Sequence, residues 1–199
     1  ADLFTAAGCQ AAVAAPVEAF GGLDILVNNA STAVSGNIET LDDNQLMERL
    51  NGKTLAYMRC CRAALPHLRK SARGRVICIG GTASRTAGDT ALPSALGNSA
   101  ISAFVKQFST MVAAQGITAN VVHPPFTKTD RYPARRAALA KQLGISEAEA
   151  DKKYASQFPI GRIVEPSDIA PMVLFLASPH ASAITGQNIA IDGGWSAGK

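Results

Sequence analysis

Short runs rich in Val and Ile alternate along this chain with longer stretches in which apolar residues recur at three-and-four spacing. The first three short runs each begin just after a glycine or a glycine-containing turn, which is typical of buried β-strands. The four runs are residues 25–30, 75–80, 117–124 and 188–194. Strands that are buried on both faces and separated by helices predict a parallel α/β sheet with right-handed crossovers.

The longer stretches between these runs predict helices. Residues 40–68 carry an apolar stripe that ends soon after Pro66, residues 94–115 close at Gly116, and a third helix opens at residues 166–168. With 199 residues, the chain is expected to form a single domain spanning residues 1–199. The longest irregular stretch, residues 124–159, contains a polar helical segment near residues 147–154, and we interpret it as a substrate lid.

Composition and charge exclude several classes of function. No apolar run approaches the ~20 residues that a membrane span needs. The net charge is only +4, and no basic stripe interleaved with aromatic residues suggests a nucleic-acid partner. The cysteines form no CxxC pair and have no histidine at metal-ligand spacing, so we expect no metal site. They are expected to be small buried hydrophobic residues in a reducing cytoplasm, and they are Cys9, Cys60, Cys61 and Cys78.

Three blocks of sequence occur in a specific order. Residues 21–31 read GGLDILVNNAS, residues 117–129 read ITANVVHPPFTKT, and residues 161–195 end in DGGW. Taken singly, each is an ordinary strand exit or turn, but together and at this spacing the chain resembles the short-chain dehydrogenase/reductase family. The resemblance implies a Rossmann-type doubly wound parallel sheet, NAD or NADP as cofactor, and a small carbonyl or alcohol as substrate.

The same resemblance bears on the cofactor. Asp2 stands twenty-six residues before Asn28, which suits the family's aspartate against the adenine ring and implies that the family's first strands would lie before residue 1. The glycine-rich turn that receives the pyrophosphate is not found in this sequence, so we expect a sheet lacking its first strands and weak or absent dinucleotide binding. The resemblance places the remaining cofactor contacts at Asn28, Ala30, Pro124, Thr127 and Thr129. Thr129 can alternatively be read as a local turn hydroxyl.

The family's reactive side chains are replaced in this chain. The family carries a serine, then a tyrosine thirteen residues later, then a lysine four residues after the tyrosine. Matching on the helix around residues 100–106 puts Gly81, Ser94 and Asn98 at those positions. A phenol with a pKa near ~10 can be tuned toward neutrality, whereas serine is a far weaker acid and asparagine carries no charge. Ser94 and Asn98 can also be read as loop-end and helix-cap residues.

A lysine stands where the family has its active-site asparagine. Counting back from Pro66 puts that asparagine position on Lys53, so a lysine and an asparagine have exchanged helices. The alternatives are a solvated surface lysine or a one-residue register error, with Asn51 brought near the site by a local shift of the helix. Thr82 is either a substitute hydroxyl for the lost serine or a strand-end residue. We therefore expect a proton relay drawn from Lys53, Thr82, Ser94 and Asn98.

On the sequence alone, two functions remain open. The first is an NAD(P)-dependent oxidoreductase with nonstandard catalytic residues. The second is a catalytically silent family member that serves as a binding or oligomer-forming subunit. In either case the resemblance implies a homodimer or homotetramer that pairs residues 40–68 and 94–115 with their symmetry mates, because these helices carry more apolar residues than one sheet face needs.

Overall fold

The computed structural model describes residues 1–197 and contains a four-stranded, entirely parallel β-sheet. Its strands are β1 (Ile25–Asn28), β2 (Arg75–Ile79), β3 (Thr118–His123) and β4 (Asn188–Ala190), and they follow one another across the sheet in chain order. All four strands predicted from the sequence are confirmed, although each is shorter than its apolar run. The carboxyl ends of the parallel strands therefore meet at one edge of the sheet.

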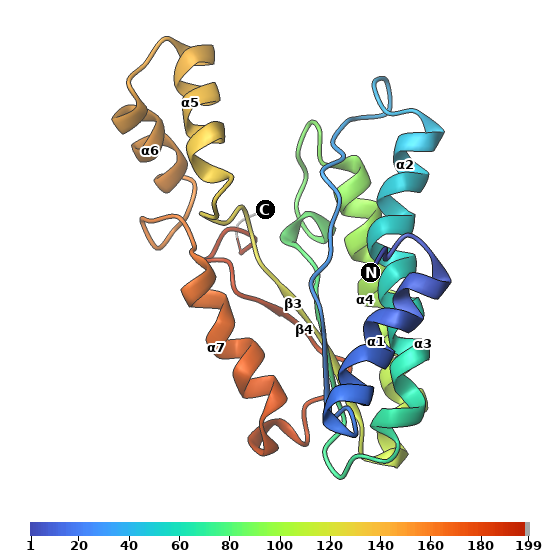
Figure 1. Ribbon diagram of the computed structural model, residues 1–199. Helices are drawn as coiled ribbons and strands as arrows, with labels where there is room; N and C mark the ends of the chain where they lie inside the picture. The colour runs from blue at the N-terminus through green and yellow to red at the C-terminus, as the bar shows by residue number, and fades with distance from the viewer. Residues whose placement is uncertain (198–199) are drawn as a thin grey trace.

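Helices cover both faces of this sheet, as a doubly wound fold requires (Figure 1). Three of them pack together on one face: α1 (Ala6–Phe20), α3 (Ala56–Leu68) and α4 (Leu92–Val112). On the other face, α7 (Pro166–Ala177) packs against β2 and β3, and a 3₁₀ turn follows at Pro179–Ala181. The main hydrophobic core lies between the three-helix layer and the sheet.

The helical segment predicted over residues 40–68 is interrupted in its middle. It begins with α2 (Asp43–Arg49), where Asp42 and Gln45 form a capping box, and it continues into a π-helical turn (Leu50–Leu55) before α3. A π-turn inserts an extra residue into the helix and frequently occurs at functional sites. Here the widened turn carries Lys53.

The region between β3 and α7 is more ordered than the sequence suggested. The sequence predicted a helix only near residues 147–154, and this helix is confirmed as α6 (Glu147–Ala155). Residues 132–143 were interpreted as irregular, but they form α5 (Tyr132–Leu143), which ends at Gly144 with a positive φ of 66°. Its apolar residues are mostly alanines and form no wide stripe, and the helix leaves the body of the protein. Together α5 and α6 form an arm that projects past the sheet (Figure 1).

Two short 3₁₀ turns join the remaining elements. One, Thr82–Ser84, follows β2, and the other, Ala113–Gln115, closes α4 at Gly116. The helix predicted over residues 94–115 is thus confirmed and starts two residues earlier. Between residues 1 and 197, no helix is long and apolar enough to cross a membrane.

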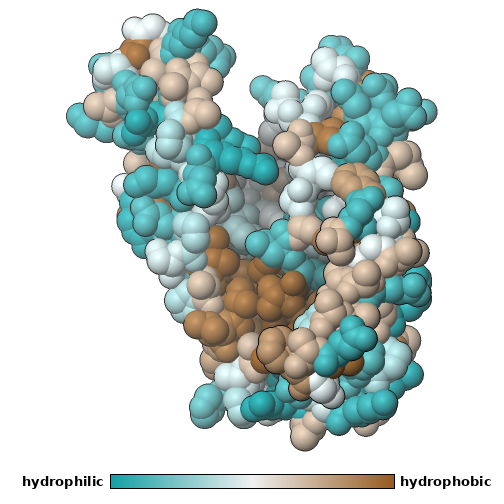
Figure 2. Space-filling model, viewed as in Figure 1, coloured by the Kyte–Doolittle hydropathy of each residue, from teal (hydrophilic) through white to brown (hydrophobic). Residues whose placement is uncertain are grey.

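The sheet is open on the side that faces α7. At the edge strand β1, the side chains of Ile25 and Val27 remain 38% and 44% exposed. An apolar patch accordingly lines the lower half of the groove between α7 and the body of the protein (Figure 2). This groove leads up to the carboxyl edge of the sheet.

Candidate active site

A cleft of about 340 Å³ opens at the carboxyl ends of β1, β2 and β3. Ligands of open α/β sheets bind at this edge. The helical wall of the cleft contributes Arg49 and Lys53, the strand ends contribute Gly80, Gly81 and the segment around Pro124, and the arm contributes residues near Tyr132. The cleft is therefore assembled from four stretches that are distant in sequence, within residues 29–31, 49–53, 79–81 and 124–135.

Lys53 is buried in the helical wall of this cleft, with only 4% of its surface exposed. Its Nζ donates a hydrogen bond to the carbonyl oxygen of Gly80 at 2.9 Å and lies 6.0 Å from the centre of the Tyr57 ring. Burial, with a smaller contribution from the nearby Arg49, lowers the pKa of Lys53 to about 7. A lysine in this state exchanges its proton near neutral pH.

Arg49 lies one helical turn before Lys53 and is also buried. Its guanidinium donates to the Ser31 hydroxyl at 2.6 Å, to the Thr32 carbonyl, and to Ser94 Oγ at 3.3 Å. Its Nε is buried without a hydrogen-bond partner. Sequence reasoning did not identify Arg49, although its spacing of four residues before Lys53 on the same helix was a usable signal.

Asn98 and Gly81 are packed against each other at the end of β2. A Cβ built on Gly81 would lie 2.6 Å from Asn98 Nδ2, and Asn98 Oδ1 is buried without a hydrogen-bond partner. The Gly81 amide donates at 3.0 Å to Nδ1 of His123, which is fully buried as a scaffold residue. Lys53 and Asn98 thus contact the consecutive residues Gly80 and Gly81, but Asn98 is not among the residues that line the cleft.

The other predicted relay residues lie beside the cleft. Ser94 receives its hydrogen bond from Arg49, and Thr82 is buried with its amide bonded to the Pro124 carbonyl at 2.9 Å. Neither residue lines the cleft. Asn51 does not take the asparagine position, because its amide oxygen accepts a hydrogen bond of 2.6 Å from Arg59.

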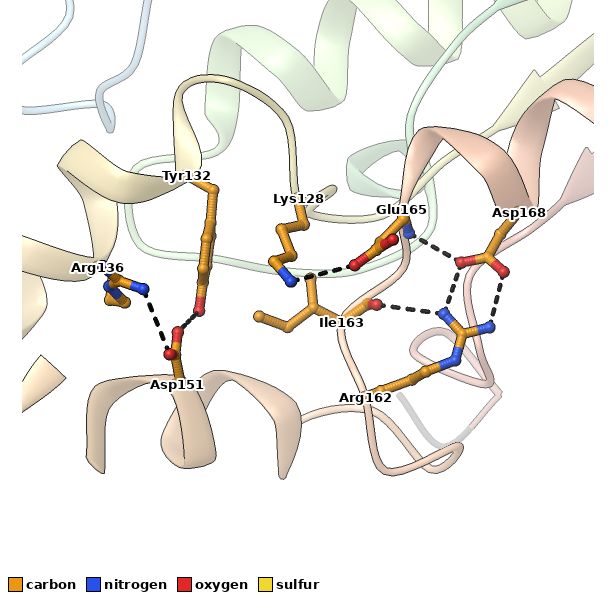
Figure 3. Close-up of polar contacts among 8 residues, drawn as sticks. All are labelled: Lys128, Tyr132, Arg136, Asp151, Arg162, Ile163, Glu165 and Asp168. Atoms are coloured by element: carbon orange, nitrogen blue, oxygen red, sulfur yellow. Dashed lines mark hydrogen bonds and ion pairs between the residues drawn. The ribbon is translucent and has the colours of Figure 1, made fainter. Parts of the chain in front are cut away.

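The arm brings Tyr132 to the mouth of the cleft. Its hydroxyl donates to Asp151, which also contacts Arg136 at 3.4 Å (Figure 3). Burial and the Asp151 carboxylate raise the pKa of Tyr132, so this phenol holds its proton instead of releasing it. The Lys128 ammonium and the Glu165 carboxylate form an ion pair at 3.1 Å, which links the segment before α5 to the start of α7.

Half of the predicted cofactor residues line the neighbouring groove, whose volume is about 500 Å³. These are Pro124, Thr127 and Thr129, joined by Asn29, and the opposite wall is the apolar side of α7. The predicted Asn28 is instead turned into the core, where its amide lies 3.5 Å and 3.6 Å from the sulfurs of Cys61 and Cys78. All four cysteines are free and buried, as expected.

The last two predicted cofactor residues also lie away from the groove lining. The Ala30 carbonyl accepts a hydrogen bond of 2.9 Å from Tyr57, and Asp2 is exposed with its carboxylate bonded to the Phe4 amide at 3.0 Å. The groove offers hydroxyl and amide groups at one end and apolar walls at the other, which fits an aromatic ring that bears a carboxamide. Thr129, Asn29 and Ile169 would hold such a nicotinamide ring.

Known proteins resemble this chain in sequence. The family described as Enoyl-(Acyl carrier protein) reductase matches residues 1–196. Relatives include the short-chain reductase protein NovJ of Streptomyces niveus, 32% identical over 97% of this chain and 72% of its own length. The NADPH-dependent reductase BacG of Bacillus subtilis is 31% identical over 87% of this chain and 67% of its own length.

Solved structures agree as well. A variant of the actinorhodin polyketide ketoreductase, solved with NADPH, superimposes with a TM-score of 0.90 at 29% identity, covering 98% of this chain and 76% of that one. Because a family profile spans almost the whole sequence and these relatives share both fold and sequence with it, the chain belongs to the short-chain dehydrogenase/reductase family.

Proposed function

We propose that this chain is an NAD(P)-dependent oxidoreductase that interconverts a carbonyl and an alcohol, with Lys53 as the residue that moves the proton. The observation that carries the proposal is the state of Lys53. It is buried at the carboxyl edge of the sheet, it bonds one neutral carbonyl, and its pKa is lowered to about 7. A group that titrates near the working pH is the most effective general acid or base.

The residues around Lys53 are arranged to support proton transfer by its amine. In the direction of reduction, the Lys53 ammonium would donate a proton to the alkoxide oxygen that forms on the substrate. In the direction of oxidation, the neutral amine would accept the hydroxyl proton. The Gly80 carbonyl orients the amine, and Arg49 helps to keep the pKa low. Asn98 acts as a positioning residue behind Gly81, and Ser94 as a positioning residue on Arg49.

Bound in the adjoining groove, NAD or NADP would supply or accept the hydride. The residues proposed to hold its nicotinamide ring are Asn29 and Thr129, with Ile169 of α7 against the face of the ring. BacG is named as an NADPH-dependent reductase, and the ketoreductase variant was solved with NADPH, which favours NADPH as the first cofactor to test.

The arm is proposed to act as a lid over the cleft. Its helices α5 and α6 pack on each other, and its aromatic residues cluster at its base, where the Phe126 and Tyr154 rings stack at 4.8 Å. Tyr132 and the arginines at the start of α5 line the cleft from this side. A movement of the arm would therefore open or close the cleft around the substrate.

One observation favours a second function, that of a silent binding subunit. Ser94 and Asn98 are both engaged in packing, and neither lines the cleft. A catalytically inactive protein would keep the fold and the cleft but would not catalyse the reaction. In that case Lys53 would be only a buried structural cation.

Turnover of the purified protein with NADPH and a panel of aldehydes and ketones separates the two functions. We expect Lys53→Met to lower kcat by roughly 10²–10⁴-fold, the usual range for a lost acid–base group. Lys70→Met, which changes an exposed lysine far from the cleft, serves as the control and should have no effect. Absence of any turnover, with NADPH still bound, would support the silent subunit, and an unchanged kcat in Lys53→Met would exclude the Lys53 mechanism.

A further inference from the structure

The cleft carries positive charge without any acidic counterpart. Four of the side chains that line it are cationic, Arg49 and Lys53 from the helical wall and Arg131 and Arg135 from the arm, and the described lining contains no Asp or Glu. The whole chain has a net charge of only +4. The cations are therefore concentrated on opposite sides of one cavity.

These four cations differ from the others around them. Within residues 1–197, none of the four takes part in an ion pair, whereas the neighbouring Lys128 and Arg136 both do. Arg135 lies over the Phe126 ring at 5.2 Å, and a cation–π contact of this kind uses the charge of the guanidinium without occupying its N–H donors. In the arm, Glu147 and Asp151 pair with Arg136 and Glu149 bonds Ser146, so none of these carboxylates pairs with a cleft cation.

Arg49 is the clearest example of a cleft cation without a counter-ion. Only 5% of its surface is exposed, its hydrogen-bond acceptors are all neutral oxygens, and its Nε is buried without a partner. A buried cation without a counter-ion is costly, and the cost falls when an anion binds beside it. The Lys53 amine lies one turn away and, in its protonated form, adds to the positive potential of the same cavity.

From this arrangement we propose that the cleft binds an anionic substrate, a carbonyl or alcohol compound bearing a carboxylate or phosphate group, with that group held between Arg49 and the arm arginines Arg131 and Arg135. The guanidinium fork matches both anions in a bidentate manner. The reacting carbon would lie deeper, near Lys53 and Gly80. The choice of substrate class rests on the proposed function, but the anion site itself does not.

The proposed anion site is tested by binding measurements that do not depend on enzymatic turnover. Isothermal titration in chloride-free buffer at low ionic strength measures the affinity of the intact protein for two test anions, malonate and inorganic phosphate, with neutral malonamide as the matched control. We expect both anions to bind and malonamide not to bind. Arg135→Gln and Arg131→Gln, which change exposed side chains, should each weaken anion binding by about 10–100-fold, and Arg49→Gln by at least as much.

Arg73→Gln is the control for a general loss of positive charge, because Arg73 is an exposed arginine outside the cleft. It should leave anion affinity unchanged. If Arg49→Gln does not fold, the two arm variants decide the question. Equal affinity of the parent and the arm variants for malonate and phosphate, or no measurable affinity in the parent, would overturn the proposal.

A second arm of the experiment separates a substrate anion from a cofactor phosphate. The protein is titrated with NADPH with and without saturating malonate. Unchanged NADPH affinity supports a substrate site, whereas competition, together with an equal loss of NADPH affinity in Arg135→Gln, would assign the site to the cofactor and overturn the proposal. Anion binding without turnover would uphold the site and refute the oxidoreductase function. Turnover of neutral ketones without anion binding would uphold the oxidoreductase function and refute the anion site.

Discussion

Asn98 occupies the space that a side chain on Gly81 would fill: a Cβ on Gly81 would lie 2.6 Å from Asn98 Nδ2. The register predicted from the sequence puts these two residues at the positions of the family's serine and lysine, and in that register each replacement would accommodate the other. The Gly81 backbone is extended, and any residue could adopt it. The obstacle to a side chain there is therefore packing alone.

This relationship predicts the stability of variants at Gly81. Gly81→Ala should destabilise the protein by about 1–3 kcal/mol, as expected for an overpacked site. Asn98→Ala should relieve the clash, so that the double variant loses less stability than the sum of the single variants. Urea denaturation of the four proteins measures the coupling. Gly22→Ala, where a Cβ meets nothing within 4 Å, is the control, and strict additivity would show that the two positions do not interact.

The lowered pKa of Lys53 predicts how stability depends on pH. Between the native value of about 7 and the unfolded value near ~10.4, the unfolded chain binds one more proton than the native protein, so stability rises with pH in this window. Below pH 7, both states are charged and the burial cost is fully present. The free energy of unfolding of Lys53→Met, relative to that of the parent, should therefore be highest at pH 6. This advantage should shrink by up to about 1.4 kcal/mol per pH unit toward pH 10.

Chemical denaturation of parent and Lys53→Met at several pH values checks this expectation. The groups that face the Lys53 amine are retained in both proteins; they are Arg49, Tyr57, Cys78 and His123. Of these, burial lowers the pKa of His123, so its charge changes below the window. A stability difference that does not change between pH 7 and pH 10 would mean that Lys53 keeps its proton in the native protein.

Arg162 and Asp168 predict a loss of stability in acid. Two hydrogen bonds of 2.6 Å and 2.7 Å from Arg162, and one from the Glu165 amide, lower the pKa of Asp168 to about 2 (Figure 3). The stabilisation is present above the unfolded pKa of ~3.9 and disappears as the pH falls toward 2. The melting temperature of Asp168→Asn should therefore fall less than that of the parent between pH 5 and pH 2. Asp89→Asn serves as the exposed control, and parallel melting curves for Asp168→Asn and the parent would contradict the prediction.

The outer face of α3 and α4 predicts self-association. A shallow apolar groove of about 300 Å³ lies there between Met58, Leu65 and Met111, beside the stacked rings of Phe104 and Phe108. We expect a homodimer or homotetramer through this face, which Met111→Lys should dissociate. Light scattering at micromolar concentration measures the mass, and Ile38→Lys, which changes an exposed residue elsewhere, should leave it unchanged. A monomeric parent protein would refute this assembly.

The sequence by itself determined the layers of this protein and identified Lys53 as a candidate site residue. Strands and helices could be predicted because the periodicity of apolar residues is a local property of the chain. The register that puts Gly81, Ser94 and Asn98 at the positions of the family's reactive residues needs only the spacing between motifs, and it stays a prediction. Lys53 and Asn98 were found by this counting.

The tertiary structure decided what those residues touch. The lowered pKa of Lys53 arises from burial by segments that lie far away in sequence, and no local pattern encodes that desolvation. Arg49 looked like one more polar residue on a helix until the fold buried it beside Lys53. Helix α5 escaped prediction because it projects from the body and needs no wide apolar stripe, yet it brings Arg131 and Arg135 to the cleft. Charge, burial and proximity at this site come from the packing of distant segments, which only the folded chain establishes.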